Sequence, residues 1–340
     1  MSGKSILRII PLSFQWETLD PFLFCVHHQD FYPKGNELHG PEASLSGRHI
    51  GQDFTLKDGW RMYHGDKVPG FPVHPHRGFE TVTIVRTGIV DHSDSLGAAG
   101  RYGEGDVQWL TTGKGVQHSE MFPLLHKEKD NPLELFQIWL NLPKENKMVP
   151  PHFKMLWRND IPKVKECDAD GKTIEIEVIA GELGETIAPS PTPDSWAANP
   201  ENQVAIWLIH MESEARWKIP KAKAGLNRTL YFFDGDSVLI QDQDIKTMHG
   251  VILASDQDVE VLAGEKNASL LLLQGRPINE PVAQYGPFVM NDEQEIQQAF
   301  SDYRQTQFGG WPWPGASPVH GATRGRFAKH ADGLEEEPHD

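Results

Sequence analysis

The sequence predicts an all-β protein built from two similar modules in tandem, and three observations support this interpretation. The 31 glycines and 25 prolines are spread between short apolar runs, as in proteins with many short strands. Apolar and polar residues alternate within these runs, for example at Phe136, Ile138 and Leu140. A Pro- and Lys-rich segment over 143–165 separates two sets of runs. Short, evenly spaced strands favour a sandwich or a barrel.

The first module is expected to span residues 1–150. Ile6 to Ile10 is predicted as a buried strand, because its apolar run is too short for a signal peptide or a membrane span. The pattern then predicts strands from Thr81 to the turn at Thr87 and Gly88, over 105–110 and over 133–142.

The second module is expected over 165–290, with strands bounded by Gly, Asp or Asn turns. Its predicted strands are 173–178, 204–210, 229–233, 237–240, 250–254, 258–262 and 268–273. Residues 291–340 should form a short helix and an extended tail. The helix is predicted over 292–304, with Asn291 as N-cap and Gln294 completing a capping box. The tail is polar and poor in apolar residues, so we expect it to be extended or loosely docked.

The composition limits the classes of function. The formal net charge of −16 repels nucleic acid and anionic lipid, and no basic patch interrupts it. The two cysteines, Cys25 and Cys167, cannot build a disulfide framework, so a reducing cytoplasm is the expected location. Cys25 is expected to be an inert buried thiol. No glycine-rich nucleotide motif or P-loop is present.

Two histidine-containing segments carry the chemistry. His74 and His76 are two residues apart, and His118 and Glu120 repeat that spacing about forty residues later. Side chains at i and i+2 of a strand project from the same face, so two neighbouring strands can offer four ligands in one direction. Imidazoles with a carboxylate suit Fe(II), Mn, Ni, Cu or Zn. Four protein ligands on an octahedral metal leave two positions open, which is typical of catalytic sites.

With the glycine-rich turn at 112–115, these segments match the two-part cupin signature, and the chain resembles the pirins, iron-binding members of that superfamily. The resemblance covers nearly the whole sequence and rests on the segments 74–83, 105–109, 113–120 and 275–291. It implies two cupin barrels of the double-stranded β-helix, or jelly-roll, type. It also implies that His74, His76, His118 and Glu120 hold the metal in the first barrel, and that the second barrel has no metal.

Strand periodicity alone does not decide whether Glu80 or Glu120 is the fourth ligand. Glu80 lies four residues from His76, so both Glu80 and Glu120 are expected to face the interior. The pirin resemblance favours Glu120 as the ligand and leaves Glu80 as a residue that orients an imidazole. His92 is a weaker candidate for the mouth of the barrel. The aromatic residues Trp60, Phe71, Phe79 and Trp109 either line an apolar cavity or, as we favour, form core.

The resemblance implies an Fe(II)-dependent dioxygenase that opens the heterocycle of quercetin-type flavonols with O₂. In that reaction Glu120 is also the candidate general base, and the electron-rich substrate supplies the electrons. The alternative is a redox-sensitive iron-binding regulator that binds a transcription factor or a metabolic enzyme, in which case the partner is a protein and not DNA. Two barrels that cover their own sheet edges are compatible with a monomer.

Overall fold

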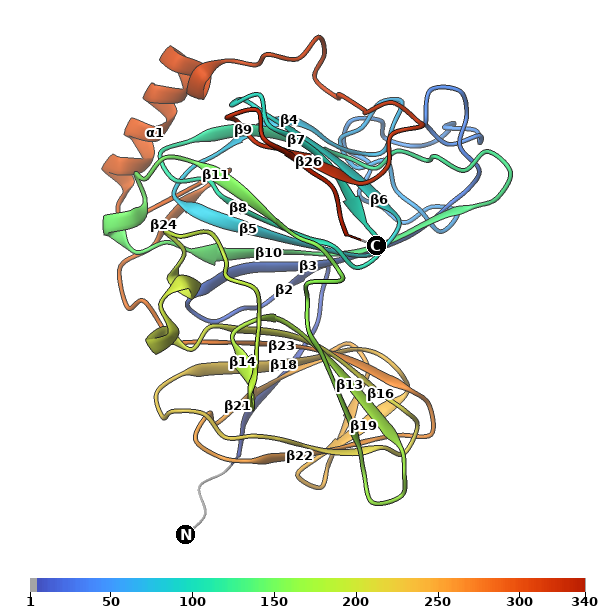
Figure 1. The fold of residues 1–340 in the computed structure, drawn as a ribbon, viewed down its shortest axis with the longest axis vertical. Helices are drawn as coiled ribbons and strands as arrows, with labels where there is room; N and C mark the ends of the chain where they lie inside the picture. The colour runs from blue at the N-terminus through green and yellow to red at the C-terminus, as the bar shows by residue number, and fades with distance from the viewer. Residues whose placement is uncertain (1–4, 340) are drawn as a thin grey trace. The chain divides into compact units, whose positions relative to one another are not determined.

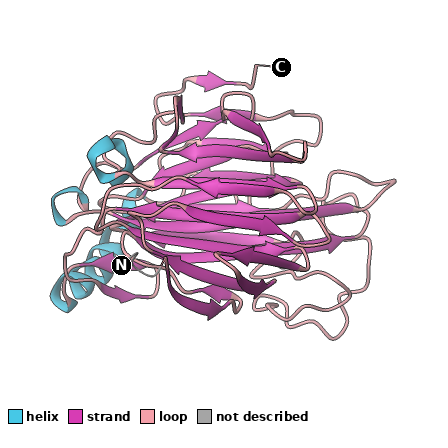
Figure 2. Ribbon diagram, turned by 90° about the horizontal axis from the view of Figure 1, so that it is seen from below, coloured by secondary structure: helices cyan, strands magenta, loops and turns pink. Residues whose placement is uncertain are grey.

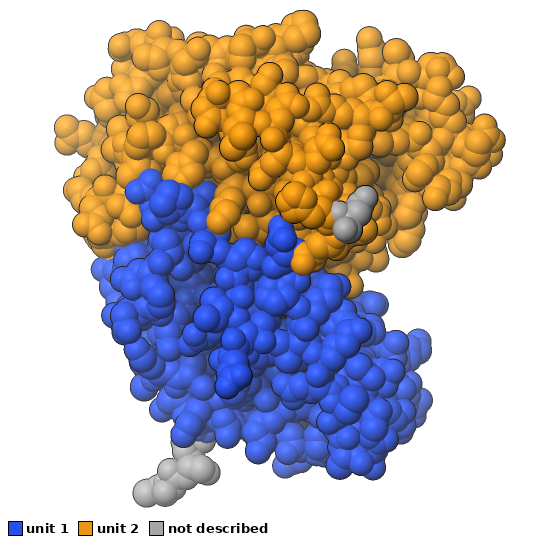
Figure 3. Space-filling view, in the orientation of Figure 1, with its two compact units in different colours: residues 1–26, 160–279 blue, residues 27–159, 280–340 orange. Residues whose placement is uncertain are grey.

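The computed structural model describes residues 5–339, and most of their regular structure is β-strand, as Figure 2 shows. The chain divides into two compact units, coloured separately in Figure 3. Unit 1 comprises residues 1–26 and 160–279, and unit 2 comprises residues 27–159 and 280–340. The all-β prediction is therefore confirmed. The predicted boundaries at residues 150, 165 and 290 stay predictions, and unit 1 combines residues from the start of the chain with those of the second module.

Unit 1 contains a seven-stranded antiparallel sheet and a four-stranded one. The seven strands, in spatial order, are β1 (Ile6–Pro11), β21 (His249–Leu253), β18 (Asn227–Asp234), β23 (Ala268–Gly275), β16 (Ala205–Met211), β13 (Thr173–Ala180) and β12 (Lys163–Cys167). The four are β17 (Arg216–Ile219), β22 (Val259–Ala263), β19 (Ser237–Ile240) and β20 (Gln243–Lys246). The small elements are β14 (Glu182–Leu183), β15 (Thr186–Ile187) and the 3₁₀ turns η2 (Trp196–Ala198) and η3 (Pro200–Asn202). The strand predicted at Ile6 is confirmed as β1, but it is not buried throughout, because Ile6 and Ile10 are buried while Leu7 is exposed.

Unit 2 is built on two sheets, which Figure 1 shows as two layers. The first has the order β11 (His152–Leu156), β8 (Val107–Thr111), β5 (Phe79–Thr87), β10 (Asn131–Asn141) and β3 (Phe22–Tyr32), of which residues 27–32 belong to unit 2. Residues 22–26 of β3 belong to unit 1, where they pair with β2 (Gln15–Trp16). The second has the order β27 (Glu335–Glu336), β26 (Phe327–Lys329), β7 (Ala99–Gly103), β6 (Ile89–Asp94), β9 (Val116–Met121) and β4 (Gly70–His76). We call the second the histidine sheet.

The helix α1 (Glu293–Thr306) forms as predicted, but its cap is one residue later than expected. Asp292 is the N-cap, because its side chain accepts a hydrogen bond from the Glu295 backbone N–H. Glu295 in turn accepts at 2.9 Å from the N–H of Asn291, the residue before the N-cap, so the return bond is made one residue earlier than in a capping box. The helix packs against the hairpin of β24 (Ala283–Tyr285) and β25 (Phe288–Met290).

The tail after α1 begins with the 3₁₀ turn η4 (Gln307–Gly309) and is extended, as predicted, but it is not loosely docked. Its strand β26 pairs with β7, and Phe327 and Ala328 within it are buried. The expectation of loose docking was wrong because backbone hydrogen bonds hold the tail to β7. Amino-acid composition does not reveal such bonds. A further 3₁₀ turn, η1 (Lys144–Asn146), follows β10. Within residues 5–339, no helix is long and apolar enough to cross a membrane.

Candidate metal centre

Three of the predicted ligands meet on the histidine sheet of unit 2. β4 and β9 are antiparallel neighbours, and their register places His74 directly opposite His118. His76 follows two residues later on the same face of β4. The ring centroids of His74 and His118 are 4.5 Å apart, and His76 lies 4.7 and 4.9 Å from these two rings. Each histidine offers a nitrogen within 4.8 Å of the others, a spacing that can hold a metal ion.

The hydrogen bonds of two of these histidines orient them for a metal. His74 Nδ1 lies 2.8 Å from the Pro72 carbonyl oxygen, and His76 Nδ1 lies 3.3 Å from that of Pro287. A carbonyl can only accept, so each Nδ1 carries the proton and each Nε2 has its lone pair free. Burial lowers the pKa of His74 to about 4 and holds that of His76 well below its ordinary value, so both rings are neutral near pH 7.

His118 gives the most direct sign of an absent group. The residue is fully buried, and neither of its ring nitrogens has a hydrogen-bond partner among residues 5–339. Burial also holds its pKa well below the ordinary value. An imidazole that is buried without a partner costs free energy, and a bound cation removes that cost. The donor set therefore fits a metal ion.

Glu120 lies on the same face as His118, but its carboxylate is outside the group formed by the three histidines. Its Oε1 accepts from the Thr83 hydroxyl at 2.9 Å and from the Tyr102 hydroxyl at 3.3 Å, and its Oε2 accepts from Gln137 Nε2 at 2.8 Å. Burial raises the pKa of Glu120, and the charge of His92 and these donors oppose that rise. Glu120 as fourth ligand and as base remains a prediction.

Glu80 does not face the interior that holds the three histidines and Glu120, so the expectation that it points inward is wrong. Thr83 faces the interior, because it bonds Glu120, and Glu80 is an odd number of residues away on the same strand. The Glu80 carboxylate instead accepts from the Thr111 hydroxyl at 2.7 Å. Counting in steps of two from His76 to Glu80 failed because these residues lie on different strands. β4 ends at His76 and β5 begins at Phe79, so the alternation of faces is not continuous between them.

Aromatic residues and one further histidine surround the centre. Phe79 contacts His76 with ring centroids 5.1 Å apart, and the Phe71 ring lies 6.4 Å from that of His74. The fully buried His92 ring lies 5.6 Å from that of His118. Trp109 pairs with Val82, and both lie on the face of their sheet that points away from Thr83 and the metal centre. Trp109 is therefore core, as favoured above. Because His74 is only partly buried, the centre borders solvent on that side.

Several residues of this site escaped the sequence interpretation. Thr83, Tyr102 and Gln137 hold Glu120, yet their residue types carry no metal or catalytic signature. Period-two alternation from Phe79 would have placed Thr83 on the inner face. Nothing in the sequence indicated Tyr102 and Gln137, which lie on other strands.

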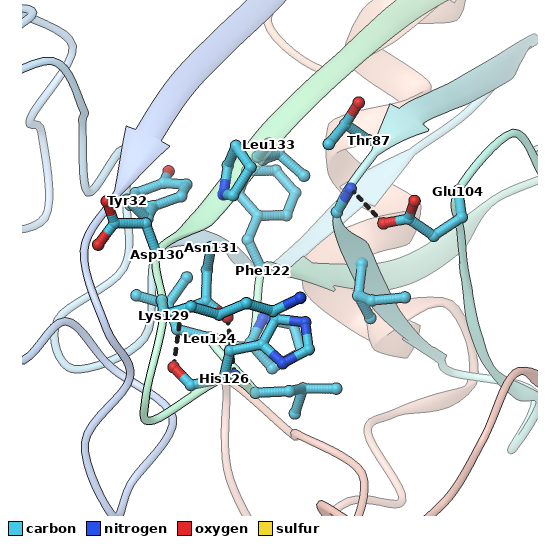
Figure 4. Close-up of a pocket in the computed structure, with 15 residues that line it drawn as sticks. Tyr32, Thr87, Glu104, Phe122, Leu124, His126, Lys129, Asp130, Asn131 and Leu133 are labelled. Atoms are coloured by element: carbon cyan, nitrogen blue, oxygen red, sulfur yellow. Dashed lines mark hydrogen bonds between the residues drawn. The ribbon is translucent and has the colours of Figure 1, made fainter.

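A separate cavity of about 510 Å³ lies in unit 2, between the ends of β5, β9 and β10 (Figure 4). Its walls are largely apolar, with Phe122, Leu124 and Leu133 buried. The Glu104 carboxylate accepts from the Gly88 backbone N–H at 2.9 Å, and Asn131 is bonded to His126. None of the predicted site residues lines this cavity.

Comparison with known proteins agrees with the two-module architecture. The family model described as pirin matches residues 14–140, and the model of the pirin C-terminal cupin domain matches residues 206–309. A Pseudomonas aeruginosa protein provisionally named a quercetin 2,3-dioxygenase is 36% identical over 239 residues, covering 70% of this chain and 79% of that protein. Human pirin is 35% identical over 254 residues, covering 73% and 80% respectively.

A crystal structure of quercetin 2,3-dioxygenase from Acinetobacter baumannii is similar with a TM-score of 0.69 and 27% identity. The similarity covers 90% of this chain and 98% of that protein. The prediction of two cupin barrels is thereby confirmed, and the C-terminal family model ends where the docked tail begins.

Proposed function

Because this chain belongs to the pirin family of two-barrel cupins, we propose that it is an iron-dependent dioxygenase that opens the heterocycle of quercetin-type flavonols with O₂. The observation that carries the proposal is the His74, His76 and His118 cluster, in which a fully buried imidazole has no partner among the described residues. Relatives named for quercetin dioxygenation support the choice of substrate.

His74, His76 and His118 would hold the metal through neutral ring nitrogens, with Glu120 as the candidate fourth ligand. A bound iron would supply Lewis-acid and redox chemistry toward the flavonol and O₂. The fixed tautomers of His74 and His76 aim their Nε2 lone pairs, so little reorganisation is needed on loading.

In this proposal Glu120 would accept the proton of the flavonol hydroxyl. Thr83, Tyr102 and Gln137 orient its carboxylate, and a carboxylate has further lone-pair positions for one more donor. Phe79 and Phe71 give the centre apolar flanks that suit a flat aromatic molecule and limit water. The flavonol supplies the electrons, so no nicotinamide or flavin is required.

The test is oxygen uptake by anaerobically Fe(II)-loaded protein given quercetin, with metal content measured in the same sample. We expect one O₂ consumed per flavonol lost by absorbance. Glu120→Gln should retain bound iron and lose turnover, because the amide cannot accept the proton. His118→Ala, treated identically, should neither hold iron nor consume O₂.

An iron-filled wild-type protein that consumes no O₂ with quercetin would refute the quercetinase proposal. The redox-sensitive regulator would then take its place, and its partner should bind differently to the ferrous and ferric forms.

A further inference from the structure

The tail of unit 2 crosses the outer face of the histidine sheet and then joins that sheet as strand β26, beside β7. We call residues 307–329 the strap. Within the histidine sheet, His74, His92, His118 and Glu120 point inward, and adjacent residues on their strands point outward. The strap contacts this outer set: Asp91, Arg101 and Gln117. Figure 1 shows β26 beside β7, with β9 and β4 in the same layer.

Arg101 anchors the strap with all of its N–H groups. The residue is 1% exposed, and its Nε and Nη2 donate to the two oxygens of the fully buried Asp91 at 2.7 and 2.8 Å. Its remaining N–H groups donate to the carbonyls of His320, Gly321 and Arg324, at 2.8 to 2.9 Å. A guanidinium has five N–H donors, and here each has an acceptor.

Other strap contacts fall beside the metal-site histidines. Gln117, the neighbour of His118, donates from Nε2 to the carbonyls of Gln307 and Gly310, at 2.7 and 3.1 Å. The backbone N–H of Val73, the neighbour of His74, donates to the Ala316 carbonyl at 2.8 Å.

Strand β6, which carries His92, is held in the same way. Trp313 Nε1 donates to the Asp94 carbonyl at 2.8 Å, and His320 Nε2 donates to the His92 carbonyl at 2.9 Å. The ring of His92 in turn packs 5.6 Å from that of His118.

The contact at Val73 matters because β4 is the edge strand of its sheet. β4 pairs only with β9 there, and the register shifts between Phe71 and His74. An irregularity leaves backbone groups unpaired and loosens the ladder locally. Without the Ala316 carbonyl, the Val73 N–H beside a predicted ligand would have no protein acceptor. The strap therefore completes the strand at the point where ligand geometry is least constrained.

We propose that the strap is a positioning element of the metal centre, which holds β4, β6, β7 and β9 from the outer face and so slows loss of the metal. The proposal rests on the metal-binding part of the proposed function and not on the oxygenase reaction. The strap itself contributes no ligand. It acts through the strands that carry His74 and His118.

The test uses full-length protein loaded with Co²⁺, whose absorption spectrum reports ligand geometry, and a chelator that measures release. Arg101→Lys keeps the charge beside Asp91 but cannot replace five planar donors. It should release Co²⁺ about tenfold or more faster, the scale expected for residues that orient metal ligands, with an altered spectrum. Trp313→Phe loses one hydrogen bond, is the milder change, and should shift both readouts in the same direction by less.

Ile84→Ala is the matched control. Ile84 is buried in unit 2 on the face of β5 that points away from Thr83, so its truncation lowers stability without touching the strap. We expect this variant to unfold more easily and to keep the wild-type spectrum and release rate. Strap variants whose spectra and release match those of Ile84→Ala at equal stability would overturn the proposal. A wild-type protein that binds no Co²⁺ would instead refute the metal centre itself.

Discussion

The two barrels differ most in what fills them. In unit 1, one cluster of buried apolar side chains joins both sheets and includes Trp207, Trp217 and Phe232. Its main buried charge, Arg228, is bonded to Gln274 and to the Pro220 carbonyl. In unit 2, the inner face of the histidine sheet carries four imidazoles, those of His74, His76, His92 and His118, and the Glu120 carboxylate. The same architecture thus supports a packed core in one unit and a polar centre in the other.

The polar centre of unit 2 lies beside a buried apolar cluster that includes Tyr102, Val116 and Phe122, so it replaces only part of the apolar packing. Buried imidazoles and carboxylates lose hydration that apolar side chains never had. Unit 2 compensates with hydrogen bonds around Glu120 and with the strap that Arg101 anchors. Each of the following changes tests whether the two barrels are specialised in this way.

The largest effect should come from removing one histidine. His118→Ala should reduce metal binding from one equivalent to none at micromolar metal, because it removes the most buried donor of the cluster. The comparison change is His210→Ala in unit 1, where the residue is exposed and lies outside the histidine cluster. It should leave metal content unchanged by elemental analysis. Metal retained by His118→Ala would place the site elsewhere.

Mild acid should destabilise unit 2 of the metal-free protein before unit 1. Burial lowers the pKa of His28 to about 3 and that of His74 to about 4, below the 6.5 of the unfolded chain. Between these values the unfolded chain binds more protons, so stability falls as the pH falls from 6.5 toward 4. Asp30, whose pKa burial raises to about 6, gains protons in the folded state over the same range and offsets about 1 kcal/mol, so the net loss should reach roughly 2 kcal/mol by pH 5.

Hydrogen exchange resolved by peptide can check this prediction. Protection in β9 should be lost at a higher pH than protection in β23, and metal loading should delay the loss in β9. Equal pH profiles for the two strands would contradict the assignment of the acid-sensitive groups to unit 2.

Thr83→Val should cost about 2 kcal/mol, because it removes a donor to the buried Glu120 carboxylate while keeping side-chain shape. The free energy of unfolding, measured by urea titration of metal-free protein, reports the change. Thr229→Val in unit 1 is the matched substitution of a buried threonine on a strand. It should cost less, since no buried carboxylate depends on Thr229.

The smallest effect is expected in the packed barrel. Ile209→Val removes one methylene from a residue that is 2% exposed in the apolar cluster of unit 1, and should cost about 1 kcal/mol. Metal affinity, measured by titration, should not change. A loss of metal affinity here would show that the two barrels are coupled and not independently specialised.

Strand periodicity and turn residues were sufficient to predict most strands and the meeting of His74, His76 and His118. They failed for Glu80, because the turn between β4 and β5 breaks the alternation of faces that was counted from His76. They also missed Tyr102 and Gln137, since contacts between distant strands depend on register and closure. The family resemblance supplied the expected role of Glu120, which periodicity had left open.

The anchoring of the strap has a consequence for how its sequence can change over time. Arg101 bonds to the carbonyls of residues 320, 321 and 324, and every amino acid supplies a carbonyl. Substitutions at residues 321 and 324 should therefore leave these bonds in place, while Arg101 and Asp91 tolerate none. Trp313 and His320 bond through their side chains and are constrained. Much of the remaining strap can diverge in sequence and keep its place, so its presence in a homologue is better judged from the Asp–Arg pair on the barrel than from the tail itself.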